Sequence, residues 1–253
     1  MTDPLGFLRE FARGRAEQVT GRPFGFIARS MQRFPHAHDH NFSSVFLPAD
    51  PADLLAEVEA EFADVRYRRV EVASDVLTPA LTSALVEAGY EREDQIVMTW
   101  LRPPDIDRPP ATDVTELDIE QRVDIADRVW AEDFDQPDPV VRRELAERAH
   151  SAMTAAQCTF LGVVGADGGI EASCDLFVRG DVAQIEEVST LTPFRGRGHA
   201  SRLVRAAAER ATAAGAGTVF LVAEADDWPK DLYARLGFDV TATNTVWSRS
   251  TEA

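Results

Sequence analysis

The stretch that decides the fold is Val188–Ser201, which reads VSTLTPFRGRGHAS. It begins as the end of a predicted strand, turns through Gly196 and Gly198, and leads into a helical pattern over Gly198–Ala214. Consecutive backbone N–H groups in such a turn, with the partial positive charge of a helix start, form a site for a phosphate or pyrophosphate. Glycine suits this site because it lacks a Cβ and reaches positive φ. A glycine-rich turn that only bends the chain is the alternative left open.

Two other phosphate-binding classes fit the turn less well. A P-loop needs Gly-x-x-x-x-Gly-Lys-Ser/Thr, and the sequence contains no such run. A dinucleotide-binding fold needs Gly-x-Gly-x-x-Gly after its first strand, whereas Ser201 stands at the third glycine and three predicted strands precede the turn. We therefore expect neither of these two sites.

A second motif, Leu232–Phe238 (LYARLGF), follows the turn after one predicted helix and one predicted strand. Together with Arg195-x-x-Gly198-x-Ala200, it resembles the two signatures of the GNAT superfamily of acyl-CoA-dependent N-acyltransferases. The resemblance covers about residues 112–250. It implies an acetyltransferase domain that takes acetyl-CoA as its co-substrate and holds no metal.

By that resemblance the backbone of the turn holds the CoA pyrophosphate, and the end of the preceding strand pairs with the pantetheine arm. The cofactor-binding residues would be Val188, Ser189, Thr190, Arg195, Gly196, Arg197, Gly198, His199, Ala200 and Ser201. Tyr233 matches the tyrosine that serves many members as general acid, and packing beside Phe238 is the other role open to it.

The general base is expected on the strand before the turn. The position of the catalytic glutamate in histone-type members falls on Gln184, whose amide cannot usefully accept a proton. In a regular strand Glu186 shares the face of Gln184, and Glu187 faces the other way unless a bulge exchanges them. We expect Glu186 to be the base, with a water relay or a base elsewhere as open alternatives. Tyr233 and Glu186 are therefore the candidate catalytic residues.

The elements on either side of the turn predict an α/β (α+β) fold. Helices are expected over Leu5–Val19, Pro51–Phe62, Pro79–Ala88, Ile119–Glu132, Pro139–Ala152, Gly198–Ala214 and Pro229–Leu236. Strands are expected over Phe42–Leu47, Tyr67–Ala73, Gln95–Leu101, Val114–Leu117, Cys158–Val164, Ile170–Arg179, Val182–Leu191, Thr218–Ala223 and Asp239–Arg249. The recurring strand–helix–strand–helix–strand order predicts two GNAT-like halves, each a mixed central sheet flanked by helices, with parallel neighbours in the first half.

A proline-rich seam separates the two halves. Arg102–Pro110 has four prolines in nine residues, which predicts an extended linker and hence domains at 1–105 and 106–253. The turn of the first half, Leu47–Pro51, has no glycine, and its acid and prolines suit a phosphate badly. We therefore expect a degenerate GNAT-like domain without a cofactor site at 1–105 and an acetyl-CoA-binding domain at 106–253.

The net charge of the protein limits the classes of partner that it is expected to bind. The 253 residues carry a net charge of −17, and 45% of them are hydrophobic, which excludes a disordered chain. Such an acidic surface disfavours nucleic acid and acidic lipid, and favours a small-molecule amine acceptor. No apolar run is long enough to span a membrane and the amino terminus resembles no secretory signal, so we expect a cytoplasmic protein. The protein could also form a homodimer. The alternative to an acetyltransferase is a non-catalytic acyl-CoA-binding or scaffold protein.

Two further groups of residues were considered as metal or redox sites. His36, His38 and His40 alternate and could face a transition metal, but nothing nearby completes a ligand set. Cys158 and Cys174 have no partner spacing for zinc, and we expect reduced, buried thiols. The sequence therefore predicts no metal site.

Overall fold

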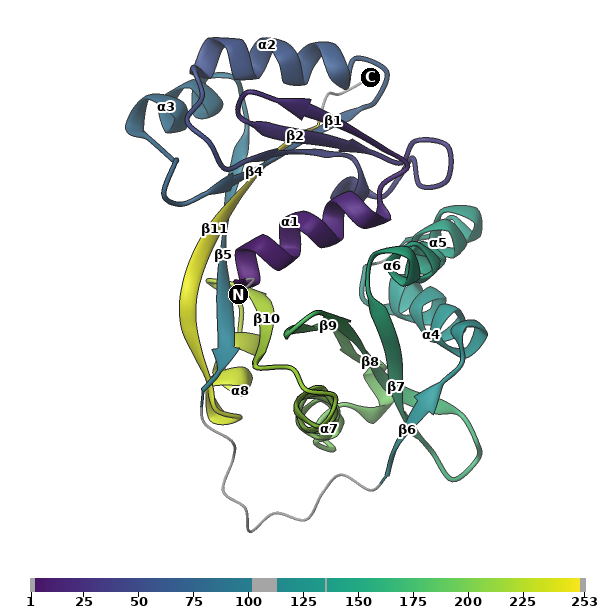
Figure 1. Cartoon of the computed structure of the whole chain (residues 1–253). Coiled ribbons are helices and arrows are strands. Elements are labelled where there is room, and N and C mark those ends of the chain that lie inside the picture. The colour runs from purple at the N-terminus through teal and green to yellow at the C-terminus, as the bar shows by residue number, and fades with distance from the viewer. Residues whose placement is uncertain (1–2, 102–112, 135, 251–253) are drawn as a thin grey trace. The chain divides into compact units, whose positions relative to one another are not determined.

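The structure, a computed structural model, describes residues 3–101, 113–134 and 136–250 (Figure 1). The chain forms two compact units, each built from separate stretches of sequence. Unit 1 takes its described residues from 1–15, 97–222 and 228–241, and unit 2 from 16–96, 223–227 and 242–253. The predicted linker Arg102–Pro110, and with it the predicted boundary after residue 105, lie outside the described residues.

Unit 2 contains a mixed sheet in the order β1-β2-β3-β4-β11, with β5 beyond β11. Its strands are β1 (Gln18–Arg22), β2 (Gly25–Arg29), β3 (Phe42–Val45), β4 (Tyr67–Ala73), the first part of β5 (Glu91–Trp100) and the second part of β11 (Phe238–Ser250). β3 and β4 run parallel, whereas the pairs β1–β2, β2–β3 and β4–β11 are antiparallel. A 3-10 turn, η1 (His38–His40), precedes β3.

Two helices, α2 (Pro51–Glu61) and α3 (Pro79–Glu87), lie beside this sheet (Figure 1), and their buried apolar residues pack in one core with those of the strands. Each begins with a proline in its first turn behind a capping side chain, Asp50 for α2 and Thr78 for α3. The core between helices and sheet contains Leu54, Val58, Leu81, Leu85, Ile27, Val45, Val70, Val72 and Trp247. Burial of this set from water stabilises unit 2.

Unit 1 contains the part of the same mixed sheet that runs in the order β5-β10-β9-β8-β7-β6, with the first part of β11 beside β5. Its strands are β6 (Val114–Leu117), β7 (Gln157–Val164), β8 (Ile170–Arg179), β9 (Val182–Thr190) and β10 (Thr218–Glu224). β6 to β9 form antiparallel pairs, and β9 pairs with β10 in parallel.

The helices of unit 1 are α1 (Pro4–Arg15), α4 (Ile119–Glu132), α5 (Pro139–Ala146), α6 (Arg148–Ala155), α7 (His199–Ala213) and α8 (Pro229–Arg235), with the 3-10 turn η2 (Thr192–Phe194) before α7. The long helix α7 packs against β8 and β9, and α1 packs beside α6 (Figure 1). Aromatic rings join α1 to the sheet, since Phe11 stacks on Phe177 at 4.8 Å and Phe7 meets Phe220 edge-on at 5.4 Å. The predicted α/β class, with mixed sheets flanked by helices, is confirmed.

The structure corrects three expectations for the elements. The first helix ends at Arg15 rather than Val19, because residues 18–29 form the hairpin β1–β2, which the sequence analysis missed. The predicted helix Pro139–Ala152 is two helices, with a break at Glu147. In unit 2 the second and third strands of the first half are not parallel neighbours, because β11 lies between β4 and β5.

Candidate functional site

The strand β9 leaves one edge open at its carboxyl end. Its pairing with β10 ends at Gln184 and Phe220, whereas its pairing with β8 continues to Thr190. The backbone groups of β9 beyond Gln184 therefore have strand partners on the β8 side. The predicted pantetheine-binding residues Val188, Ser189 and Thr190 lie on this section.

A β-bulge interrupts β9 at the predicted base. The register with β8 shifts between Ser173 and Asp175, so that the segment between Glu186 and Ser189 holds one more residue than its partner. Glu187 has φ 54°, a left-handed conformation that a side chain other than glycine seldom adopts. The bulge changes the regular alternation of faces, and both Glu186 and Glu187 line the same cavity.

The turn after β9 has the backbone that the glycines allow. Gly196 and Gly198 both have φ 77°, and Gly198 is the residue before α7. An α-helix leaves its first N–H groups without acceptors inside the helix. Within the described residues no side chain caps α7, so the amides of His199, Ala200 and Ser201 are available to a ligand.

The turn, the end of β9 and two helices enclose a cavity of about 800 Å³ within unit 1. Of the predicted cofactor residues, Val188, Ser189, Thr190, Arg195, Gly196, Gly198, His199, Ala200 and Ser201 line it. Val129, Asp133, Phe134, Phe194, Trp228 and Leu232 complete the lining, together with Glu186 and Glu187. The cavity thus combines an uncapped helix start, which is a general anion site, with the open edge of a strand.

Arg195 and Arg197 are held by the protein around the turn. The Arg195 guanidinium donates from Nε to the carbonyl oxygen of Thr190 at 3.1 Å and pairs through Nη2 with Asp133. Arg197 is not among the cavity-lining residues, and its guanidinium lies over the ring of Phe194 at 5.1 Å.

The two glutamates of the bulge have different surroundings. The Glu186 carboxylate accepts a hydrogen bond from Nε2 of Gln184. The Glu187 carboxylate accepts from Nη2 of Arg148 at 3.1 Å and lies 3.7 Å from Nη2 of Arg122. Two guanidinium groups therefore compensate the charge of Glu187.

The arginine next to Glu187 belongs to a buried ion pair that sequence reasoning missed. Arg122 on α4 holds Asp175 on β8 through two hydrogen bonds, of 2.5 Å and 2.9 Å, and both side chains are buried. Removal of one member of such a pair leaves an uncompensated buried charge. The signal available in the sequence was an aspartate within the otherwise apolar run Cys174–Val178.

Tyr233 lies on α8, buried and edge-on to Phe238 with ring centroids 6.4 Å apart. It is not itself among the cavity-lining residues, although its neighbour Leu232 is. The structure therefore shows the packing contact that was one of its two predicted roles, and its role as a proton donor stays a prediction.

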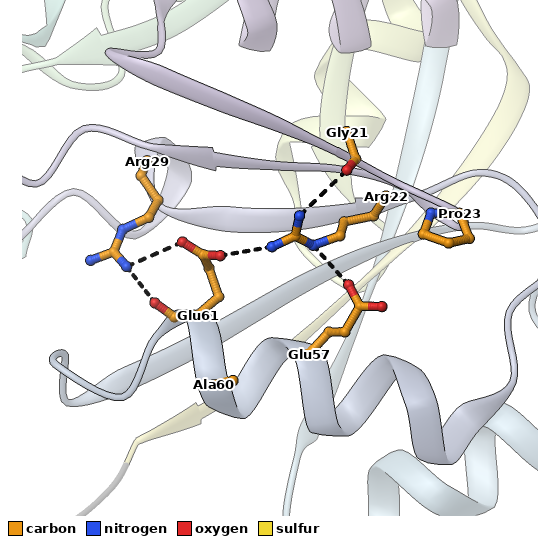
Figure 2. A pocket seen from close by; sticks show the side chains of 7 residues that line it. All are labelled: Gly21, Arg22, Pro23, Arg29, Glu57, Ala60 and Glu61. Carbon is orange, nitrogen blue, oxygen red and sulfur yellow. Dashed lines mark hydrogen bonds and ion pairs between the residues drawn. The ribbon is translucent and has the colours of Figure 1, made fainter.

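A second cavity, of about 580 Å³, lies in unit 2 and is lined by charged side chains that pair with one another (Figure 2). Arg22 bridges Glu57 at 2.7 Å and Glu61 at 3.0 Å, and Arg29 contacts both the carboxylate and the backbone oxygen of Glu61 (Figure 2). Because each guanidinium already faces a carboxylate, this cavity lacks the open N–H groups of the cavity in unit 1.

The histidines and cysteines named as possible metal or redox residues include side chains that pack against aromatic rings or are partly buried. His40 is buried against Phe34, and the His38 ring lies 3.7 Å from that of Tyr67. Over the described ranges no group of three or more potential metal ligands was found. Burial raises the pKa of the Cys158 thiol to about 12. Among the described helices, none combines the length and the apolar character needed to cross a bilayer.

Comparison with known proteins agrees with the geometry. Residues 160–248 match the family model described as FR47-like protein, which begins in β7 and ends in β11. The matched stretch contains the glycine turn and the Tyr233 motif. No curated protein matches the sequence.

Solved structures extend the likeness to nearly the whole chain. A GCN5-related N-acetyltransferase from Kribbella flavida matches with a TM-score of 0.63 and 17% identity, covering 97% of this chain and 96% of its own. The chain has the fold of the GNAT N-acetyltransferases. A conserved protein of unknown function from Staphylococcus epidermidis matches with a TM-score of 0.69 and 14% identity over 94% and 95% of the two chains. A tandem GNAT protein from the clavulanic acid biosynthesis pathway matches with a TM-score of 0.60 and 14% identity over 90% and 74%.

Proposed function

We propose that the protein is an N-acetyltransferase that transfers an acetyl group from acetyl-CoA to a primary amine of a small, cationic acceptor. The observation that carries the proposal is the uncapped start of α7, which opens with Gly196 and Gly198 into the cavity of about 800 Å³ in unit 1. Uncapped helical amides at a glycine turn are a general anion site, and the pyrophosphate of CoA is such an anion.

The residues of this chain would divide the binding of acetyl-CoA between them. The amides around Arg195–Ser201 hold the pyrophosphate, and the edge of β9 at Val188–Thr190 offers backbone groups to the extended arm. When bound, acetyl-CoA supplies an acyl group activated as a thioester. The chain then has to remove one proton from the acceptor and return one to sulfur.

Glu186 and Tyr233 are proposed for the two proton transfers. The acceptor reacts as the neutral amine, after its ammonium proton has passed to solvent. Glu186 takes one proton from the amine nitrogen as that nitrogen forms its bond to the acyl carbon, and this proton balances the one that Tyr233 gives to sulfur. Tyr233 donates the phenolic proton as the bond from that carbon to sulfur breaks. Tyrosine has an ordinary pKa of about 10 against about 8.5 for a thiol, so this transfer is uphill yet feasible within a hydrogen bond.

The charge of the site supports a cationic acceptor. Residues 106–253 carry 26 acidic and 15 basic side chains. Glu186, Glu187 and Asp133 line the cavity, and an acidic cleft concentrates cations. The preference for a cation should weaken as salt screens these charges.

Two measurements test the proposal. Calorimetry with CoA should give one site per chain, because the first amides of α2, the corresponding helix of unit 2, already donate to the side chain of Asp50. Release of CoA thiol should be faster with polyamines and aminoglycosides than with neutral or acidic amines, and slower at high salt. Binding without turnover on any amine would instead support a non-catalytic acyl-CoA-binding protein, and a preference for acidic acceptors would contradict the charge argument.

A further inference from the structure

The side chain of His199, which directly follows the glycine turn, is buried. His199 is the first residue of α7, and its side chain is only 6% exposed. Its Nε2 lies 2.9 Å from Oε2 of Glu171 on β8, although the N–H direction is not ideal for a hydrogen bond. Its Nδ1 faces Nη2 of Arg202, one helical turn further on.

Glu171 contacts the turn at both of its ends. The backbone carbonyl of Glu171 accepts a hydrogen bond of 3.0 Å from the amide of Leu191, which precedes η2. The carboxylate of the same residue meets the ring of His199, which follows Gly198. Glu171 thus contacts both ends of the segment 191–199, which contains both glycines.

The turn needs such support at its two glycines, because they contribute no side-chain contacts of their own. Gly196 and Gly198 have no side chain to pack, and an added Cβ at either would meet nothing within 4 Å. Glycine also has the largest backbone freedom of any residue, so an unsupported glycine pair samples many conformations. A ligand that needs one conformation would have to order the turn at its own cost.

We propose that His199 is a positioning residue, whose ring, held between Glu171 and Arg202, fixes the first amides of α7 in the orientation that binds the pyrophosphate of CoA. This inference rests on the proposed use of the turn for CoA. The neutral ring suits both contacts, because Nδ1 accepts from the Arg202 guanidinium while the Nε2 proton faces the Glu171 carboxylate.

The charges around the ring favour that neutral form. Burial lowers the pKa of His199, and the nearby Arg202 and Arg197 lower it further, whereas Glu171 acts in the opposite direction. Arg202 is itself paired with Asp113, which orients its guanidinium. The ring therefore remains a donor at one nitrogen and an acceptor at the other near neutral pH.

The test compares His199→Gln with His199→Leu. The glutamine amide also carries one donor and one acceptor, so His199→Gln should bind CoA within about threefold of the wild type. His199→Leu has neither, and its Kd for CoA should rise at least about tenfold, as expected for a lost hydrogen bond to a charged group. At saturating acetyl-CoA the kcat of both variants should stay close to that of the wild type, since the ring acts on binding.

Glu171 supplies the second pair of variants if His199→Leu does not fold. Glu171→Gln keeps an acceptor and should bind CoA like the wild type, whereas Glu171→Ala should weaken binding as His199→Leu does. The variant that combines His199→Leu with Glu171→Ala should bind CoA no more weakly than His199→Leu alone, because His199→Leu already removes the contact between the two side chains. His150→Gln, a half-buried histidine on α6 outside the cavity lining, is the matched control and should leave the Kd unchanged.

The outcomes separate this inference from the proposed function. If the wild type binds CoA but His199→Leu and Glu171→Ala bind it equally well, the ring has no positioning role and the inference is wrong. A lower kcat with an unchanged Kd would also overturn it. If the wild type binds no CoA by calorimetry, the proposed function fails and the inference falls with it.

Discussion

In each unit a central strand is followed by a helix. The start of that helix is capped by a side chain in unit 2 and has no such cap among the described residues of unit 1. In unit 2 the chain passes from β3 to α2 through Asp50, whose carboxylate accepts from the amides of Ala52 at 2.9 Å and Asp53 at 3.2 Å. Pro51 has no N–H to offer at all. In unit 1 the crossing from β9 to α7 uses Gly198, and no described side chain caps the helix.

The difference shows how a helix start becomes a binding site or ceases to be one. Asp50 puts a carboxylate of the protein where the helix of unit 2 would otherwise attract an anion, because the first amides and the helix dipole both favour negative charge. The start of α7 has the same chemistry without an internal anion. Asp50 and Pro51 together thus leave fewer amides open at the start of α2 than Gly198 leaves at the start of α7.

The corner that follows α3 in unit 2 and the corner that follows α8 in unit 1 differ in a similar way. Gly89 and Gly237 both end a helix with positive φ, of 83° and 94°. Four residues earlier stands Leu85 in unit 2 and Tyr233 in unit 1. A buried leucine can only pack, whereas a tyrosine at the same place brings a hydroxyl that can donate a proton.

A substitution that gives the start of α7 a carboxylate, as at α2, should have the largest effect on the binding of CoA. Gly198→Asp places an anion at the start of α7, as Asp50 does at α2, and we expect its Kd for CoA to rise by about a thousandfold, since like charges brought together cost several kcal/mol. Calorimetry measures the loss. Gly198→Ala is the matched control: it carries the same backbone strain, about 1–2 kcal/mol, without the charge. If the two variants bind CoA equally, the charge of a cap is not what distinguishes the two turns.

The second difference is tested at the corner. Tyr233→Phe keeps the ring that packs against Phe238 and removes the hydroxyl, so the fold and the Kd for CoA should persist. We expect kcat to fall by about a hundredfold, at the lower end of the range for a positioned general acid. Steady-state turnover with the best amine measures it. Wild-type kcat in this variant, with chemistry rate-limiting, would leave Tyr233 with the packing role of Leu85.

Much of this comparison could be predicted from local sequence. The bounds of α4 and β8 are as predicted, and α4 begins where Asp118 and Gln121 form a reciprocal cap. The glycine turn and the absence of glycine near Asp50 were also visible in the sequence. These features depend on residues close together in the chain, and the sequence therefore shows them directly.

What could not be predicted depends on residues far apart in the chain. The place of β11 beside β4 joins Asn244–Ser250 to Tyr67–Ala73, and no local pattern encodes this pairing. The contact of Glu171 with His199 likewise depends on how β8 and α7 pack. The hairpin β1–β2 did leave a signal in the sequence, which is the glycine at position 25. The structure gives the reason for it, because a Cβ at Gly25 would lie 2.1 Å from the backbone oxygen of Ser44.

The cap of α2 should matter for stability and not for the ligand. Asp50→Ala removes the acceptor of two amide N–H groups, and we expect a loss of about 1 kcal/mol in the free energy of unfolding. The Kd for CoA should be unchanged, since the proposed site is built from unit 1. Urea unfolding and calorimetry on the same sample measure the two quantities. A second CoA site appearing in this variant would show that Asp50 alone had closed the helix start of unit 2.

The smallest expected effect is the pH dependence of stability, to which each unit contributes one histidine. Burial lowers the pKa of His199 in unit 1 and of His38 in unit 2, with Arg202 and Arg69 adding to the shift. An unfolded histidine binds a proton below about pH 6.5, whereas these folded ones do so only at lower pH. Between the two pKa values the unfolded state therefore binds more protons, and stability falls as the pH falls. We expect His199→Gln to reduce the drop in Tm between pH 7.5 and 5.5 by about 1–2 °C, and His38→Gln to reduce it by less, because the side chain of His38 is exposed and solvent screens its charge. A drop as large as that of the wild type in either variant would mean that its histidine binds its proton as readily in the folded state as in the unfolded one.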